Sequence, residues 1–402
     1  MNLDTLKARA VDLLRQACHP YGIAASPDEQ ENYRRLWSRD AMISGIAGLL
    51  AGDDTVINGF RRSIETLARH RHPSGFIPSN LLPRKPHADI SFGSLAGRVD
   101  ATGWFVAGSC LYLLNRAEES LKTELKPILR KSLELYDLWE YNGRGLVYTP
   151  LSGNWADEYP ISGHTLYDNL LRVWAMELYG RLYDDAGYLQ NARKIRGKVR
   201  INFWPDSAFE VNPGIYHPRA FRELANRGPN HFAAAVGPDG YHRRFDAAGH
   251  GLAFMLGIVK KRQVESILEY QQEIYRSIGK PLLPAFWPVI MEGDTRWHLL
   301  VRNYSYSFKN RPHHFHNGGI WPVWMGWYGL GLSTLGQPET AETFLESWMD
   351  IEGPETLNFY EYISSDQLQP AGKARLCFSA AGLILLISAV KKEFSPLIKG
   401  KD

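Results

Sequence analysis

The chain has little cysteine for its length, with only Cys18, Cys110 and Cys377 among 402 residues. Their odd number and wide separation exclude a disulfide framework and the paired cysteine spacing of a structural zinc site. We therefore expect three free thiols in a reducing compartment, and a cytoplasmic protein.

Long apolar runs and dense runs of one charge are also absent. The nearest approach to a membrane span, Leu376 to Val390, is too short to cross a bilayer and is typical of a buried helix. The first residues, "MNLDTLKARAVDLLRQAC", carry charges throughout and predict an amphipathic helix, not a signal peptide. Because 46 basic residues stand against 43 acidic ones, the composition disfavours nucleic acid and anionic membranes as partners.

Helical periodicity fills most of the chain. The segment Val56 to Arg71 has one apolar face and follows three candidate capping residues, Asp53, Asp54 and Thr55. Further helices, apolar all round and amphipathic in turn, are predicted over 104–116, 120–141, 166–178, 186–199, 254–259, 264–278, 321–335, 341–349 and 378–394. No β-α-β alternation and no linker rich in Pro or Gly interrupts this pattern. The sequence predicts an all-α fold, an (α/α)6 barrel of roughly twelve helices, as a single domain spanning residues 1–402.

Between these helices lie segments that are too rich in polar and aromatic residues for simple connections. We expect them to be loops, namely "LWSRDAMISG" (36–45), "HPSGFIPSNLLP" (72–83), "GRVDATGW" (97–104), "SGNWADEYPISGHTLYDN" (152–169), "RPHHFHNGGIWPVW" (311–324) and "NFYEYISSDQLQPAGKAR" (358–375). If the inner helices run parallel, the loops at one end of the ring converge. Carboxylates accept hydrogen bonds from hydroxyls and indoles cover C–H faces, so this composition suits a neutral polyol.

The histidines His313, His314 and His316 raise the question of a metal site. Their spacing lacks the i, i+4 helical pair that places two imidazoles on one face, and no acidic residue stands near them. We therefore predict no metal and no cofactor. The adjacent "HNGG" lacks the lysine of a phosphate-binding loop and favours a tight turn in which glycines let the backbone approach a ligand. This turn feeds a helix with Pro322 at a first helical position, and a purely structural helix entry is the alternative.

Several of these segments resemble a known family. The motifs "SRDAMISGIAGLLAGD", "GRVDATGW", "INFWPD", "FHNGGIWPVWMGWYGLGL" and "GKAR" occur in the order typical of the neutral and alkaline invertases. The resemblance runs from about Tyr33 to Val390 and implies an (α/α)6-barrel glycoside hydrolase that cleaves sucrose with inversion. One departure is clear, because the invertases carry a Met-Ile-Asp-Arg-Arg-Met-Gly type motif where this chain reads "NWADEYPISG". The Trp-x-Asp pattern here is closer to the debranching α-glucosidases.

Inverting hydrolysis requires one carboxylic acid that protonates the leaving oxygen and one carboxylate that activates water. Asp157 is the candidate acid, since it matches the position of the family's acid and aromatic neighbours would favour its protonated form. The adjacent Glu158 is an alternative. Glu361 is the candidate base, because it matches the family's Glu inside an aromatic run before the final helix. For each residue, an ordinary loop carboxylate is the other interpretation.

The remaining candidates are expected to bind the substrate: Trp37, Arg39, Asp40, Asp100, Trp104, Trp155, His316, Asn317, Trp321, Lys373 and Arg375. By resemblance, the Arg-Asp pair grips hydroxyls of a glucosyl unit, although a buried ion pair at a helix start is the alternative. The Asp-x-x-x-Trp match implies a hydroxyl acceptor followed by a stacking wall. His and Asn of "HNGG" would donate to sugar oxygens, while Trp321 could also serve packing alone. The two cations after Glu361 would keep it ionised, or are solvated charges.

These observations predict an inverting glycoside hydrolase that acts on a small α-glucoside, with sucrose as the leading substrate. A debranching-type amylo-α-1,6-glucosidase or another α-glucosidase is the first alternative. Two alternatives from other classes stay open, a sugar epimerase that uses histidines on the same barrel and a catalytically inactive sugar-binding barrel. We expect a small carbohydrate as the partner, and assembly into a homo-oligomer is left open.

Overall fold

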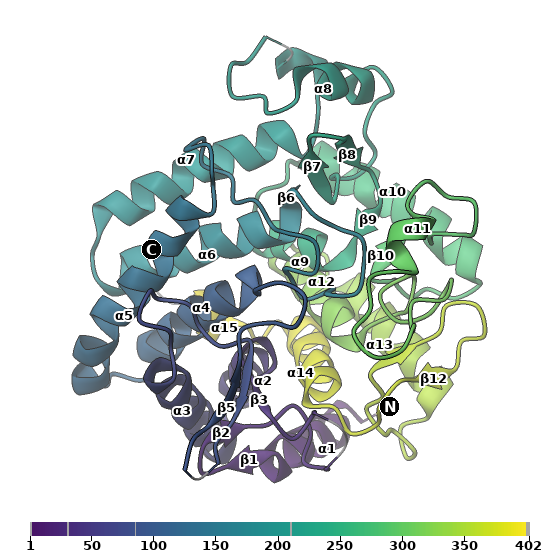
Figure 1. Ribbon diagram of the computed structural model, residues 1–402. Helices are drawn as coiled ribbons and strands as arrows, with labels where there is room; N and C mark the ends of the chain where they lie inside the picture. The colour runs from purple at the N-terminus through teal and green to yellow at the C-terminus, as the bar shows by residue number, and fades with distance from the viewer. Residues whose placement is uncertain (1, 30–31, 85, 210, 399–402) are drawn as a thin grey trace.

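A computed structural model describes residues 2–29, 32–84, 86–209 and 211–398. Six helices that are buried almost all round form an inner ring: α2 (Ser38–Ala51), α4 (Val99–Asn115), α6 (Leu166–Leu182), α9 (Ala247–Met255), α12 (Pro322–Thr334) and α14 (Cys377–Lys391). Each inner helix contacts the next one, and α14 contacts α2, so the ring is closed (Figure 1).

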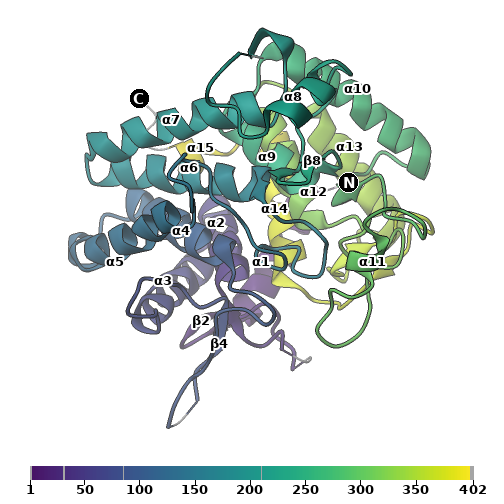
Figure 2. The same cartoon turned by 45° about the horizontal axis from the view of Figure 1, so that its top comes forward.

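Six amphipathic helices surround this ring: α1 (Leu3–Gln16), α3 (Asp54–Arg69), α5 (Glu119–Leu138), α7 (Ala186–Asn202), α10 (Lys261–Ile278) and α13 (Glu339–Glu352). α3 packs on α2, α5 on α4, α7 on α6 and α13 on α12, while α1 packs on α14 (Figure 2). The first and last hairpin elements therefore meet, although they lie at opposite ends of the chain. This arrangement confirms the predicted all-α (α/α)6 barrel.

Short elements decorate the loops. The strands form small antiparallel pairs: β1 (Cys18–His19) with β2 (Gly22–Ile23), β3 (Leu36–Trp37) with β4 (Asn80–Leu82) and β5 (Asp89–Ser91), β6 (His164–Thr165) with β7 (Ala235–Gly237) and β8 (Gly240–His242), β9 (Phe245–Asp246) with β10 (Phe286–Trp287), and β11 (Tyr362–Ile363) with β12 (Pro370–Ala371). The shorter helices are η1 (Ser207–Phe209), α8 (Pro218–Ala225), α11 (Trp297–Leu300) and α15 (Ser395–Ile398). α8 projects beyond the ring at the top of Figure 1.

Three predicted boundaries were wrong. α2 begins at Ser38 and α4 at Val99, inside segments that we expected to be loops. Their first turns carry Arg39, Asp40 and Asp100, and these charges interrupt the apolar pattern that identifies the rest of each helix. The fourth inner helix, α9, runs over Ala247–Met255 and not over 254–259.

The sequence placed the start of α9 too late, at residue 254, because the first part of this helix contains glycines. Glycine lowers the helical signal of "AAGHGLAFM", yet a Cβ on Gly251 would lie 2.9 Å from the backbone nitrogen of Tyr328 in α12. Close approach of the two inner helices therefore requires glycine here. The side chain of Asp246 caps the helix by accepting a hydrogen bond from the Gly249 amide, as Asp53 does for α3 with the Val56 amide.

The segments that enter the inner helices are joined to one another by backbone hydrogen bonds. The Val99 amide bonds to the Gly153 carbonyl, the Ala285 amide to the Gly319 carbonyl, and the Ile320 amide to the Ile363 carbonyl. These bonds connect segments that precede different helices, so the N-terminal ends of the inner helices gather at one end of the ring. No helix within the described residues is long and apolar enough to cross a membrane.

Candidate active site

The first turns of α2 and α4 bring one arginine and two aspartates together. Arg39 contacts Asp40 through Nη2 at 3.2 Å and Asp100 through Nη1 at 3.4 Å. The Tyr167 hydroxyl donates to Asp100 Oδ2 at 3.3 Å, and Trp104 Nε1 donates to that hydroxyl at 2.6 Å. Burial raises the pKa of both aspartates, and Arg39 opposes this shift. The structure thus brings the predicted Arg39, Asp40 and Asp100 into one buried polar cluster.

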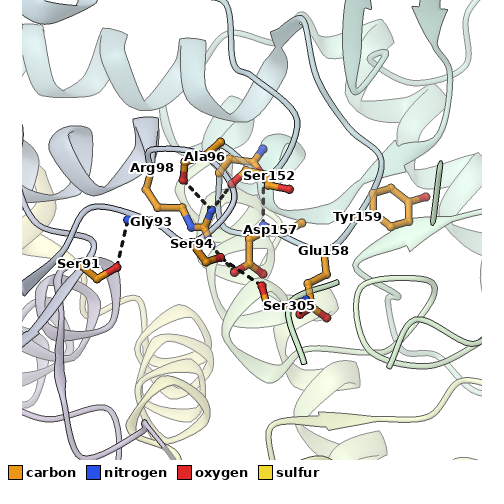
Figure 3. A network of polar contacts seen from close by, with 12 residues as sticks. Ser91, Gly93, Ser94, Ala96, Arg98, Ser152, Asp157, Glu158, Tyr159 and Ser305 are labelled. Atoms are coloured by element: carbon orange, nitrogen blue, oxygen red, sulfur yellow. Dashed lines mark hydrogen bonds and ion pairs between the residues drawn. The ribbon is translucent and has the colours of Figure 1, made fainter. Parts of the chain in front are cut away.

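The loop between β-bridge residue Thr149 and β6 carries Asp157, whose side chain is 29% exposed. Arg98 Nη2 lies 2.5 Å from Asp157 Oδ2, while Nη1 of the same guanidinium donates to the carbonyls of Ala96 and Ser152 (Figure 3). The carboxylate for which aromatic neighbours were predicted thus has a cation as its side-chain hydrogen-bond partner. Sequence position alone did not single out Arg98, although it lies inside the quoted "GRVDATGW".

Glu158 has a different environment from its neighbour. Its Oε1 accepts a hydrogen bond of 3.2 Å from the amide of Ser305, which lies beside it in Figure 3. Its backbone carbonyl accepts a hydrogen bond of 2.9 Å from Asn310. Oε2 is buried without a hydrogen-bond partner in the described part of the chain. Burial raises the pKa of Glu158, the charge of Asp157 adds to this shift, and Lys309 opposes it. The two adjacent carboxyl groups are thus held by different loops.

Glu361 lies immediately before β11 and is buried. The Tyr33 hydroxyl donates to its Oε1 at 2.6 Å, and the backbone amide of Lys373 donates to Oε2 at 3.4 Å. Burial raises the pKa of Glu361, whereas the Tyr33 hydrogen bond and the charge of Lys309 lower it. Gly372 has φ +77° and packs directly on this carboxylate, since a Cβ there would overlap Oε2. A side chain at position 372 would displace Glu361.

The two cations predicted to support Glu361 do not both lie beside it. The Glu361 amide donates to the Lys373 carbonyl at 2.8 Å, and the Lys373 amide donates to Glu361 Oε2 at 3.4 Å. The guanidinium of Arg375 instead bonds to Asp28 at 2.9 Å and to Gln16 at 2.7 Å, in the segments around α1. The predicted role of Arg375 is therefore wrong, and the charge of Lys309 is one that lowers the pKa of Glu361.

The "HNGG" segment forms the tight turn predicted for it. Gly318 has φ +97°, and a Cβ on Gly319 would overlap the carbonyl oxygen of Phe315, so the glycines allow close approach of the chain to itself. Pro322 is the first residue of α12, as expected. Asn317 does not face a ligand, because its carboxamide bonds to the backbone of Ile290 and to the Asn310 carbonyl. The structure gives Asn317 the role of holding the turn.

The three histidines of this segment point to different partners. His313 Nδ1 lies 3.0 Å from the Ser365 hydroxyl, and His314 Nδ1 lies 3.4 Å from the Tyr362 hydroxyl. His316 is buried, its Nδ1 has no partner among the described residues, and burial together with Arg39 lowers its pKa well below the usual value. Burial thus favours the neutral imidazole of His316 over its charged form. Within the described ranges, no group of three or more His, Cys, Asp or Glu side chains could hold a metal ion, and independence from metal stays a prediction.

The four predicted tryptophans differ in exposure. Trp104 is completely buried in the ring, so its predicted role as a stacking wall is wrong. Trp155 stacks on Phe286 with ring planes 7° apart, and Trp321 stacks on His316 and donates to the Phe315 carbonyl. Trp155 and Trp321 also contact each other edge to face, with ring centroids 5.5 Å apart, so both belong to one buried aromatic cluster.

Trp37 is the half-buried member of the four, and its Nε1 donates to the Asn32 carbonyl at 3.1 Å.

Three functional candidates were not identified by the sequence analysis, namely Tyr33, Arg98 and Lys309. Tyr33 reaches Glu361 across 328 positions, for which no local pattern gives a signal. A surface hollow of about 410 Å³ between α8 and β8 shares no lining residue with this cluster.

Comparison with known proteins supports the fold assignment. No protein-family model matches the chain. It is 24% identical over 412 residues to the chloroplastic alkaline/neutral invertase E of Arabidopsis thaliana, covering 85% of this chain and 65% of the relative. The chain thus spans less than two thirds of that protein.

Two solved structures share the architecture. A bacterial glucoamylase complexed with acarbose superposes with a TM-score of 0.62 at 14% identity, over 98% of this chain and 57% of the glucoamylase. A mannosylglycerate hydrolase from Thermus thermophilus in complex with glucose gives 0.57 at 15% identity, over 94% of this chain and 99% of the hydrolase. The fold is that of (α/α)6-barrel glycosidases.

Proposed function

We propose that the protein is an inverting glycoside hydrolase. The observation that carries the proposal is the pair of carboxyl groups on two loops at one end of the ring, Asp157 before α6 and Glu361 before α14. Both flank the buried cluster of Arg39, Asp40 and Asp100, since the charge of Asp157 acts on Arg39 and that of Asp40 acts on Glu361. The similarity to an invertase and the glycosidase architecture support the same class of reaction.

In this mechanism Asp157 protonates the leaving oxygen, and Glu361 removes a proton from the attacking water. An inverting pair is separated by about 6.5–9.5 Å, which leaves room for that water. Tyr33 holds Glu361 through Oε1 and thereby fixes the direction in which the other carboxylate oxygen faces. Asp157 has a partly exposed side chain, as a group that must meet a leaving group requires, whereas Glu158 is buried against the Ser305 loop.

The buried cluster would bind the sugar ring. Asp40 and Asp100 accept hydrogen bonds from hydroxyls, and the Arg39 guanidinium, whose Nε has no partner among the described residues, donates to them. His316 is neutral and offers an unpartnered Nδ1 as acceptor or donor. No cofactor takes part, because both proton transfers are assigned to carboxyl groups.

The substrate we propose is a small α-glucoside, with sucrose first because the resemblance to invertases covers nearly the whole chain. The segment "NWADEY" differs from the invertases at the acid, next to the leaving group, and this favours a debranching-type α-1,6-glucosidase as the second candidate. We also propose a cytoplasmic location, since all three cysteines are free thiols.

A hydrolysis panel tests the proposal. The purified protein is incubated with sucrose, isomaltose, maltose, trehalose and glucosylglycerate, and free monosaccharide is measured. We expect release of glucose from at least one α-glucoside. Interconversion of free sugars without hydrolysis would instead support an epimerase, and binding without turnover would support a sugar-binding barrel.

A further inference from the structure

Arg98 joins the entry of α4 to the loop that carries Asp157. The side chain is 5% exposed, and its guanidinium donates to two backbone carbonyls and to one carboxylate oxygen (Figure 3). We infer that Arg98 is a positioning residue that fixes the orientation of the Asp157 carboxyl group toward the leaving oxygen. This inference rests on the proposed function.

The position of Arg98 in its helix is unusual and needs a reason. It is the N-cap residue of α4 and makes no side-chain capping bond. A cation at the N-terminus of a helix meets the positive end of the helix dipole, which is unfavourable, and arginine is not among the preferred capping residues. The guanidinium instead bonds to the Ala96 and Ser152 carbonyls and to the Asp157 carboxyl group, so the arginine serves the Asp157 loop and not the helix.

The guanidinium fixes both ends of the segment before Asp157. It holds the Ser152 carbonyl and the Asp157 carboxylate at once, and the backbone of Gly153 is bound by the Val99 amide at 2.7 Å. Asn154 stiffens the turn further, because its side chain accepts a hydrogen bond from the Ala156 amide at 3.1 Å. With the backbone held in this way, the Asp157 side chain can still rotate, and the bond from Arg98 restricts that rotation.

Only one oxygen of Asp157 is used in this contact. Oδ2 faces Arg98, whereas Oδ1 makes no hydrogen bond to any described residue. The carboxyl group is thereby aligned with one oxygen against the protein and one oxygen free for a ligand. Such an arrangement is what transfer of a proton to a glycosidic oxygen requires.

The dependence of rate on the leaving group separates this role from a general structural one. An alkoxide leaving group needs a proton from the acid, whereas fluoride leaves without one. For Arg98→Gln we therefore expect a loss of about 10²-fold or more in kcat on the α-glucoside that the protein hydrolyses. On α-glucosyl fluoride we expect a change of only a few-fold. Asp157→Asn should show the same selective pattern with a larger loss.

Arg296→Gln is the matched control. Arg296 also anchors this loop, by donating to the Pro160 carbonyl at 3.3 Å, but it touches no carboxyl group of the candidate site. Its loss should affect the two substrates by the same factor. If circular dichroism shows that Arg98→Gln does not fold, Arg98→Lys replaces it in the comparison, because lysine keeps the positive charge. For Arg98→Lys we expect a smaller loss of kcat, again on the glucoside and not on the fluoride.

Equal losses on glucoside and fluoride, or an Arg98→Gln variant as active as the unaltered chain on the glucoside, would overturn the inference. Failure of the proposed function looks different, because the unaltered protein would then hydrolyse neither substrate.

Discussion

The hydroxyl of Tyr33 donates a 2.6 Å hydrogen bond to Oε1 of Glu361. The two residues lie 328 positions apart and meet where the last loop of the barrel passes the segment before α2. Glu361 is buried, and burial raises its pKa, so this hydrogen bond stabilises the ionised form that a general base needs.

Replacement of Tyr33 by Phe should therefore shift the acidic limb of the pH–rate profile. Without the hydroxyl, the pKa of Glu361 rises further, and the base becomes protonated at a higher pH as the solution is acidified. We expect activity to be lost at higher pH than in the unaltered protein, while the rate on the alkaline side changes little. Tyr21→Phe is the control, because the Tyr21 hydroxyl bonds to the Arg34 carbonyl and not to Glu361. An unshifted limb in Tyr33→Phe would contradict the assigned base.

The assigned acid and base are tested by isosteric replacement. Asp157→Asn and Glu361→Gln should each lower kcat by at least 10²-fold, because each removes a proton-transfer group and keeps its shape. Circular dichroism should show an intact fold in both. Glu158→Gln distinguishes the adjacent carboxyls, and we expect a clearly smaller loss from it. If Glu158→Gln were the inactive variant and Asp157→Asn the active one, the acid would be Glu158.

Gly372→Ala should impair catalysis through the base. The new Cβ would overlap Glu361 Oε2 and lie 2.7 Å from Glu361 Cβ. The φ of +77° strains an alanine, which lowers the free energy of unfolding by about 1–3 kcal/mol. Gly336→Ala is the matched control, since Gly336 has φ +85° but no neighbour within 4 Å. Both variants should lose stability in thermal unfolding, and only Gly372→Ala should also lose kcat.

Removal of metal should leave the reaction unchanged. Dialysis against a chelator is expected to preserve kcat, because protonation and water activation are both assigned to carboxyl groups. Elemental analysis of the purified protein provides the complementary measurement. Stoichiometric zinc that is lost together with activity would contradict this account and direct attention back to His313, His314 and His316.

The sequence was sufficient for the architecture and for part of the site. Alternation of apolar and amphipathic helices predicted the ring, and the charges of Arg39, Asp40 and Asp100 identified candidate site residues. The same charges hid the starts of α2 and α4, because polar residues in a first turn look like a loop.

Side-chain direction was beyond what sequence spacing could determine. Trp104 is one helical turn from Asp100, yet it points into the ring and contacts Tyr167. Arg375 stands two residues after Lys373, but its backbone has a φ of +57° and its guanidinium bonds to Asp28 and not to Glu361. Contacts such as that of Arg98 with Asp157 join residues 59 positions apart and depend on packing of two loops.

The configuration of the first product tests the central claim most directly. An inverting pair of Asp157 and Glu361 turns an α-glucoside into β-glucose, because water attacks the face opposite to the leaving group. Proton NMR of the reaction in its first minutes, before mutarotation, should show the β-anomer of glucose ahead of the α-anomer. Initial appearance of α-glucose would contradict the account.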